Sequence, residues 1–175
     1  MRMAGFFNQY SYVLGALGFI LGGVILLRLL RARWALVGLA VLLAAIALTG
    51  GWLLFRPGAS DVDSLGAADA VLQSGNPTLI EFFSNYCAGC IAARREVDQL
   101  VTDVDAMYAG LFNILRVDIH TDFGRALRER YDFSYTPEFV IFNGDGNEVW
   151  RSHVPPSIME IGSFISVEIP TVTAS

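Results

Sequence analysis

Two cysteines, Cys87 and Cys90, are the only thiols in this chain of 175 residues, and Ala88 and Gly89 separate them. They follow a short apolar run, residues 78–83, and stand where a pattern of helical periodicity begins. The unpaired N–H groups and positive dipole end of a helix N-terminus stabilise an anion, which lowers a thiol pKa. We therefore predict that Cys87 is an exposed nucleophile that attacks disulfides, and that Cys90, one turn below, resolves the mixed disulfide.

Two other interpretations of this motif are weaker. A zinc site needs about four ligands, and His120 and His153 are the only other soft candidates; both lie near strand ends and are expected to be ordinary surface residues. A purely structural disulfide between residues three apart closes a loop too small to stabilise much. We therefore predict no metal and no cofactor beyond the redox-active pair Cys87–Cys90.

An acidic residue, Glu81, lies in the apolar run six residues before Cys87, with Leu79 and Phe83 as same-side neighbours in a strand. Desolvation there would raise the pKa of the carboxyl and let it take a proton from Cys90 during exchange. The alternative is a glutamate at a strand edge that faces water.

A proline, Pro137, follows Thr136 just before another apolar run. A cis peptide bond there could turn the chain. Because proline donates no hydrogen bond, the neighbouring backbone would be free to pair with a substrate strand. Alone, this proline would be an ordinary loop residue.

The elements that must position these residues alternate between helix and strand after residue 58. Apolar periodicity, caps and turn residues predict an αβαβαββα order. The expected ranges are helix 63–74, strand 78–83, a helix after Cys87, strand 112–118, helix 122–131 with Asp122 as cap, strands 138–143 and 148–153 around a Gly-Asp-Gly turn, and helix 157–165.

Composition divides the chain into two unlike parts. Residues 1–58 hold five arginines and no acid, whereas residues 59–175 hold seven arginines and all seventeen acids. The absence of lysine excludes a lysine-based mechanism, and the overall net charge of −5 argues against nucleic-acid binding. We therefore expect a membrane anchor over 1–58 and a soluble domain over 59–175.

The anchor is predicted from two uncharged apolar runs, residues 10–27 and 34–55. They indicate membrane helices over about 10–30 and 34–55, with the first helix extended through residue 30 if Arg28 snorkels to the interface. A cleaved signal peptide would have a shorter apolar run and a small-residue cleavage site, and buried core helices would show a polar face. Small residues permit close helix approach in lipid, so glycines in the first run are expected to pack the two helices together: Gly15, Gly18, Gly22 and Gly23.

The arginines of the connection between these helices, Arg28, Arg31 and Arg33, place it in the cytoplasm by the positive-inside rule. Arg2 and Arg56 oppose this orientation. The prediction is a helical hairpin in the inner or plasma membrane, with its soluble domain outside the cytoplasm.

These motifs together resemble the thioredoxin superfamily, over about residues 77–165. The resemblance rests on the segments Ile80-Glu81-Phe82-Phe83, Tyr86-Cys87-Ala88-Gly89-Cys90, Val117-Asp118 and Tyr135-Thr136-Pro137-Glu138-Phe139-Val140-Ile141-Phe142. It implies an α/β thioredoxin-like fold, a mixed four-stranded sheet flanked by helices, preceded here by the transmembrane hairpin. It also implies that Cys87 is the nucleophile and Cys90 the resolving thiol. Glu81 would be the buried carboxyl and Pro137 the cis-proline. The substrate groove would be bordered by Tyr86, Ala88, Gly89 and Thr136.

The sequence departs from the family pattern at four places. Tyr86 stands where tryptophan is usual, Ala88-Gly89 where Gly-Pro is common, and Glu81 where aspartate is commoner. The glycine usually found near the groove is replaced around Val154-Pro155, which could reshape that groove.

The direction of electron flow is predicted from the motif itself. A strong oxidant needs a very stable Cys87 thiolate, and Ala88 and Gly89 supply no side-chain donor. We therefore expect a reductase of protein disulfides outside the cytoplasm. Because the hairpin holds no cysteine, a separate membrane thiol carrier must supply its electrons. The alternatives are a disulfide oxidase or isomerase, and a non-catalytic membrane adaptor that holds a partner in a thioredoxin-like groove.

Overall fold

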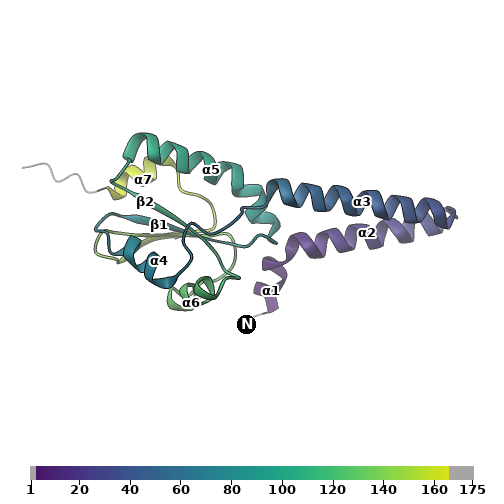
Figure 1. The fold of residues 1–175 in the computed structure, drawn as a ribbon, viewed down its shortest axis with the longest axis horizontal. Coiled ribbons are helices and arrows are strands. Elements are labelled where there is room, and N and C mark those ends of the chain that lie inside the picture. The colour runs from purple at the N-terminus through teal and green to yellow at the C-terminus, as the bar shows by residue number, and fades with distance from the viewer. Residues whose placement is uncertain (1–2, 166–175) are drawn as a thin grey trace, which may run out of the picture.

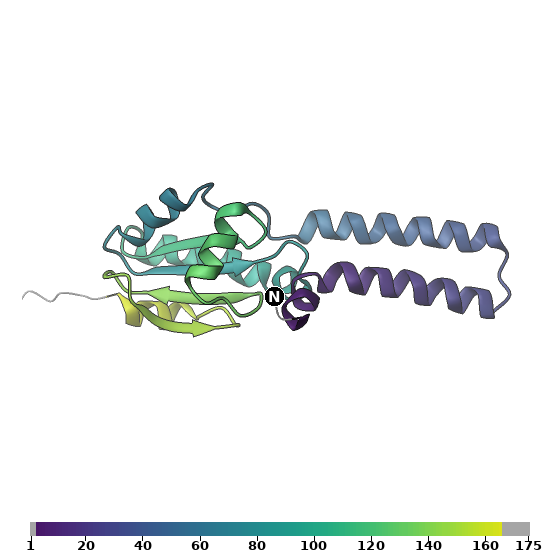
Figure 2. The same cartoon turned by 90° about the horizontal axis from the view of Figure 1, so that it is seen from below.

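The computed structural model describes residues 3–165. Its first part is a short helix, α1 (Met3–Gln9), followed by two long antiparallel helices, α2 (Ser11–Leu29) and α3 (Trp34–Phe55). The pair projects from one end of the C-terminal domain, and α1 lies at the junction between them (Figures 1 and 2). The two apolar helices form the predicted hairpin. The separate helix α1 was not predicted.

The glycines of α2 do not pack the hairpin together. A Cβ atom added at Gly15, Gly18, Gly22 or Gly23 would meet no other atom within 4 Å. The predicted glycine packing is therefore wrong. At the domain end, the hydroxyl of Tyr12 instead joins the helices by donating to the carbonyl of Leu48 at 2.6 Å.

The C-terminal domain follows the predicted order of elements. Its elements are α4 (Leu65–Leu72), β1 (Thr78–Phe83), α5 (Ala88–Tyr108), β2 (Asn113–Asp118), α6 (Asp122–Arg130), β3 (Glu138–Phe142), β4 (Glu148–Ser152) and α7 (Ile158–Phe164). The strands lie in the order β2-β1-β3-β4, with β1 parallel to β2 and antiparallel to β3, and β3 antiparallel to β4. This mixed four-stranded sheet flanked by helices is a thioredoxin-like fold.

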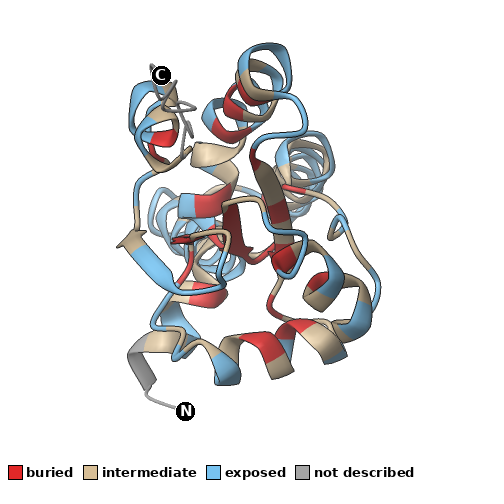
Figure 3. Cartoon of the chain, turned by 90° about the vertical axis from the view of Figure 1, so that its left-hand side faces the viewer, coloured by how far each residue is buried: buried red, intermediate tan, exposed pale blue. Residues whose placement is uncertain are grey.

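Two apolar cores hold helices on opposite faces of the sheet. On one face, residues of α4 and α6 pack against Ile80, Phe82 and their sheet neighbours; on the other, α5 and α7 pack against Leu79 and Phe139. The buried residues concentrate in the strands and the inward helix faces (Figure 3). Every residue of β1 is buried, because this central strand is covered on both faces. Its carboxyl end is thereby fixed at the end of the domain that faces the hairpin.

Side-chain hydroxyl groups cap the starts of α4, α6 and α7. Ser64 caps α4, and Ser157 forms a capping box with Glu160 at α7. Helix α6 is capped by Thr121, whose hydroxyl oxygen accepts from Gly124 N, and not by Asp122 as predicted. Asp122 is the first residue of the helix, where its negative charge interacts favourably with the positive end of the helix dipole.

Candidate active site

The two thiols lie between the end of β1 and the first turn of α5. Cys87 is the N-cap of α5, and its backbone N–H donates to the Ser84 carbonyl at 3.2 Å. Its Sγ accepts a hydrogen bond from Cys90 N at 3.4 Å, the position a capping side chain occupies. Phe83, the last residue of β1, packs with both cysteines in one buried cluster. The turn therefore holds the Cys87 sulfur over the first turn of the helix.

This position splits the acidities of the two thiols. The side-chain hydrogen bond with Cys90, helped by Thr136 and the backbone of Gly89 and Cys90, lowers the pKa of Cys87 to about 5 against the opposing effect of burial. Burial raises the pKa of Cys90, and the neighbouring Cys87 raises it further. Near pH 7, Cys87 is a thiolate and Cys90 a thiol, as a nucleophile and a resolving group require.

The loop before β3 meets the sulfur from the other side. The Thr136–Pro137 peptide bond is cis, and in the thiol form Cys87 Sγ–H donates to the Thr136 carbonyl at 3.5 Å. Gly89 lies between this loop and the thiol, since a Cβ added there would stand 3.3 Å from Pro137 Cδ and 3.6 Å from Cys87 Sγ. A larger residue at position 89 would crowd both groups.

Glu81 is wholly buried in β1 and does not face water, so the strand-edge alternative is excluded. Its Oε2 accepts from Arg116 Nε at 2.8 Å, across the paired positions of β1 and β2. Burial raises the pKa of the Glu81 carboxyl, and the Arg116 guanidinium opposes that rise. Glu81 Oε1 has no hydrogen-bond partner within residues 3–165. The carboxyl lies on the same side of β1 as Phe83, two residues from the strand end.

Similarity to known proteins covers part of the chain. No family model matches it. The chain is 35% identical over 81 residues to protein disulfide-isomerase erp38 of Neurospora crassa, covering 46% of this chain and 21% of that protein. It is 35% identical over 74 residues to the chloroplastic thioredoxin M4 of Arabidopsis thaliana, covering 42% of this chain and 35% of that protein. The chain thus spans about a third or less of each curated relative.

Solved structures of the same fold are more distant. A mutant thioredoxin from Halobacterium salinarum has 20% identity and a TM-score of 0.47, covering 61% of this chain and 89% of that one. Thioredoxin O2 from Arabidopsis thaliana in the oxidised state has 17% identity and a TM-score of 0.45, covering 58% and 86%. The two curated relatives are a thioredoxin and a protein disulfide-isomerase. The sheet order and the dithiol at the start of α5 are consistent with that similarity. The C-terminal domain has a thioredoxin-like fold and resembles the thioredoxin superfamily in sequence.

The solvent exposure of the first thiol in this thioredoxin-like domain differs from the prediction. Cys87 is 1% exposed and Cys90 is fully buried, so the prediction of an exposed nucleophile is wrong for this structure. The residues before α2 and at its start bond to positions on both sides of the sulfur: Tyr12 N donates to the Tyr86 carbonyl at 3.0 Å, and Ser11 Oγ accepts from Ala88 N at 2.9 Å. The start of α5, which carries both cysteines, lies at the end of the domain next to the hairpin (Figure 1).

Tyr86, the residue before the first cysteine, is held between hairpin residues. Its ring stacks on Trp52 with centroids 5.9 Å apart and an interplanar angle of 7°, and on Tyr10 at 5.8 Å. Trp52 Nε1 also donates to the Asn85 carbonyl at 2.7 Å. The aromatic side chain of this thioredoxin-like motif therefore anchors the domain to the hairpin.

Both histidines support the site, so their prediction as ordinary surface residues is wrong. His120 Nε2 lies 2.9 Å from Ser84 Oγ, its ring packs on Tyr86, and burial lowers its pKa. His153 Nδ1 lies 2.8 Å from the Pro137 carbonyl. The sequence offered one signal for His120, its place two residues after the end of β2, at the same sheet edge as the end of β1. Among residues 3–165 no cluster of three metal-ligating side chains occurs.

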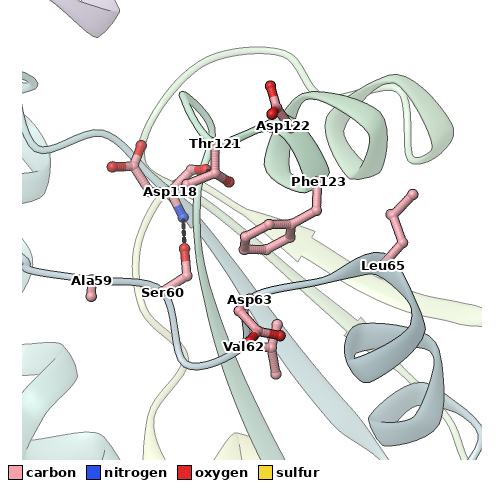
Figure 4. A pocket seen from close by; sticks show the side chains of 9 residues that line it. All are labelled: Ala59, Ser60, Val62, Asp63, Leu65, Asp118, Thr121, Asp122 and Phe123. Carbon is pink, nitrogen blue, oxygen red and sulfur yellow. Dashed lines mark hydrogen bonds between the residues drawn. The ribbon is translucent and has the colours of Figure 1, made fainter.

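A pocket of about 680 Å³ lies beside the site without including either cysteine (Figure 4). Ala59 and Ser60, after the hairpin, form one wall, and Phe123 of α6 forms another. Ser60 Oγ accepts from Asp118 N at 2.8 Å. Asp118 Oδ2 in turn accepts from Asn85 Nδ2 at 2.9 Å, so this wall is connected to the loop that carries Cys87.

Proposed function

We propose that this chain is a membrane-tethered thiol:disulfide oxidoreductase that reduces protein disulfides outside the cytoplasm through Cys87 and Cys90. One observation carries the proposal: the two thiols share the start of α5 with opposite pKa shifts, Cys87 to about 5 and Cys90 upward. A stable thiolate beside a protonated partner is the starting state for disulfide exchange.

The reaction balances as a two-electron exchange. The Cys87 thiolate attacks one sulfur of the substrate disulfide, forming a mixed disulfide and releasing the other sulfur as a thiolate that takes up a proton. Cys90 then loses its proton and attacks Cys87 Sγ. The bond to the substrate breaks, its second sulfur leaves as a thiolate, and the Cys87–Cys90 disulfide remains.

Glu81 is our proposed acceptor for the Cys90 proton. A carboxyl whose pKa is raised by burial is a better base than one in water, and its Oε1 is not engaged by Arg116 or any other described residue. Thr136 supplies backbone groups beside the sulfur for an extended substrate, and Tyr86, Ala88 and Gly89 border the same groove.

The hairpin is our proposed membrane anchor, within a division of the chain into 1–58 and 59–175. Helices α2 and α3 have 19 and 22 residues with mean hydropathies of 2.1 and 2.2, and their side chains lie almost wholly outside the protein interior. At about 1.5 Å per residue, both are near the length that a hydrocarbon core requires. The arginines of their connection favour a cytoplasmic loop, with the domain outside.

A second candidate direction is favoured by one observation. The donors that stabilise the Cys87 thiolate come from Cys90, Thr136 and the backbone, and not from the side chains of Ala88 and Gly89. A pKa of about 5 lies between the values of about 7 for thioredoxin and about 3.5 for DsbA. A disulfide oxidase or isomerase is therefore the alternative. As a reductase, the chain needs a separate membrane thiol carrier to reduce Cys87–Cys90 again.

The activity is tested with the full chain, reduced and placed in lipid nanodiscs, and insulin as a disulfide-containing substrate. We expect one Cys87–Cys90 disulfide to form for each substrate disulfide lost, as measured by mass spectrometry of alkylated products. Cys87→Ser should abolish the exchange, whereas Cys90→Ser should accumulate the mixed disulfide. Equal activity in the wild type and Cys87→Ser would contradict the proposal.

A further inference from the structure

The dithiol is covered by residues from outside its own domain. The covering residues are Asn8 to Tyr12, which end α1 and begin α2, and we call them the N-terminal cover. Their polar contacts with the domain go to residues around the Cys87 sulfur, including Ser84, Tyr86, Ala88 and Thr136. This places a segment from the start of the chain over a site more than 70 residues later.

The central contact joins Asn8 to Thr136. Asn8 Nδ2 donates to the Thr136 carbonyl at 2.8 Å, and Thr136 N donates to Asn8 Oδ1 at 2.8 Å. A carboxamide has the same donor and acceptor as a peptide unit. The Asn8 side chain therefore makes the two-bond pairing that a neighbouring strand would make at this position. In its thiol form, Cys87 donates to the same Thr136 carbonyl.

Further contacts secure the other side of the sulfur. Ala88 N, one of the free donors at the start of α5, donates to Ser11 Oγ at 2.9 Å, and Tyr12 N donates to the Tyr86 carbonyl at 3.0 Å. Ser84 Oγ donates to the Gln9 carbonyl at 2.9 Å. With the cover in place, both cysteines are closed to solvent.

We propose that the N-terminal cover is an intramolecular occupant of the substrate groove, and that a substrate polypeptide reaches Cys87 only by displacing it. This inference rests on the proposed function. Displacing the cover costs no hydrogen bond at Thr136, because the substrate backbone makes there the two hydrogen bonds that Asn8 gives up. The chain is thereby closed to nonspecific thiols and opens to an extended polypeptide that brings its own peptide groups.

The test is the alkylation rate of Cys87 in the reduced full chain in nanodiscs at pH 8, where a thiol with a pKa of about 5 is fully ionised. Iodoacetamide is the probe, and mass spectrometry measures the product. The variant Asn8→Ala/Ser11→Ala removes the pairing with Thr136 and the contact with Ala88. We expect its Cys87 to react about tenfold faster than in the wild type, because the closed state loses several hydrogen bonds.

Asn76→Ala is the matched control, because it also removes a carboxamide hydrogen bond, from Asn76 Nδ2 to the Gly110 carbonyl at 3.0 Å, away from the cysteines. Its alkylation rate should equal that of the wild type. Ser11→Ala alone should give a smaller increase than the double variant, and near-ultraviolet circular dichroism checks that each variant keeps the native fold. Equal rates in the folded double variant and the wild type would overturn the proposal.

The insulin dependence of the exchange separates this inference from the proposed function. In the single-turnover insulin assay, the double variant should reach half of its maximal exchange rate at a lower insulin concentration than the wild type, with the maximal rate little changed, because the substrate no longer competes with the cover. Faster alkylation of the double variant with no insulin reduction in any chain would overturn the proposed activity, while the cover itself would stand.

Discussion

The buried carboxylate of Glu81 and the guanidinium of Arg116 form an ion pair 2.8 Å long between the central strand β1 and the edge strand β2. Arg116 also reaches Asp98 of α5 at 3.0 Å, so one arginine connects the strand before the dithiol to the helix after it. The acid near the thiols is therefore charge-paired, and its proton affinity depends on a partner 35 residues away.

Removing Arg116 should destabilise the domain. Arg116→Gln leaves the Glu81 carboxylate buried without its counter-charge, which costs about 3 kcal/mol in the free energy of unfolding at pH 7. The double variant Glu81→Gln/Arg116→Gln should recover most of that loss, because no unpaired charge remains. Urea unfolding followed by tryptophan fluorescence measures both. If Arg116→Gln were as stable as the wild type, Arg116 would not be stabilising the buried Glu81 carboxylate.

The stability of the wild type should also depend on pH through Glu81. Because burial raises the folded-state pKa of Glu81, its contribution to stability is fully present below the unfolded value of 4.5 and is lost as the pH rises through the folded value. Glu81→Gln has no such titration. The difference in unfolding free energy between variant and wild type should therefore grow in favour of the variant as the pH rises from 4 to 7. A difference independent of pH would contradict the raised pKa.

The reactivity of Cys87 should rise at unusually low pH. With its pKa lowered to about 5, alkylation of Cys87 should increase as the pH rises through 5 and become constant above about pH 6.5. Cys90, whose pKa is raised, should react only after unfolding. Site-resolved mass spectrometry of the alkylated chain measures both. A Cys87 rate that still climbs between pH 7 and 9 would indicate an ordinary thiol.

Asn85 should couple the linker to the dithiol loop. Its side chain is bonded to Gly58 in both directions, at 2.7 and 2.9 Å, and to Asp118 at 2.9 Å. Asn85→Ala removes these bonds and should speed proteolysis within residues 56–60 severalfold, since each buried hydrogen bond contributes about 1 kcal/mol. Asn76→Ala is again the control. Unchanged cleavage in Asn85→Ala would mean that the linker is held by other contacts.

Two glycines should respond oppositely to alanine. A Cβ at Gly124 would stand 2.1 Å from the Asp118 carbonyl, whereas one at Gly66 would meet nothing within 4 Å. We expect Gly124→Ala to lose about 3 kcal/mol of unfolding free energy by overpacking and loss of the Thr121 cap, and Gly66→Ala to gain up to about 1 kcal/mol. Urea unfolding compares them directly; similar values for both would be inconsistent with the close approach at Gly124.

The proposed orientation predicts a labelling pattern in intact cells. In a Cys87→Ser/Cys90→Ser background, a membrane-impermeant maleimide should label Asp145→Cys at the tip of the β3–β4 turn, but Ala32→Cys only after permeabilisation. The reverse pattern would place the domain in the cytoplasm.

Local patterns predicted most of the domain. The strand at 78–83 has the predicted bounds. A short apolar run between Pro77 and the polar Ser84 is typical of a strand that is covered on both faces of a sheet. Strands β3 and β4 end one residue earlier than predicted. The cap of α6 was misplaced by one residue, since Thr121 and Asp122 are both good caps and only geometry separates them.

Long-range contacts account for what the sequence could not predict. The Glu81–Arg116 pair depends on the register of two strands 35 residues apart, which no local pattern contains. The burial of Cys87 depends on Asn8 and Ser11, which lie in or beside a run whose apolar composition indicates membrane contact. The apolar residues of α2 predict membrane contact along most of the helix, and this pattern does not reveal that polar residues at its N-terminal end bind the C-terminal domain.

Redox equilibration of the full chain in nanodiscs shows directly whether Cys87 and Cys90 cycle between a dithiol and a disulfide. The chain is incubated with dithiol–disulfide and glutathione buffers over a range of potentials, and mass spectrometry counts the Cys87–Cys90 disulfide. The account predicts a single two-electron transition with a midpoint near or below about −270 mV, as for a reductase. A midpoint near about −120 mV would reverse the direction of electron flow, and thiols that stay unlinked at every potential would contradict the account altogether.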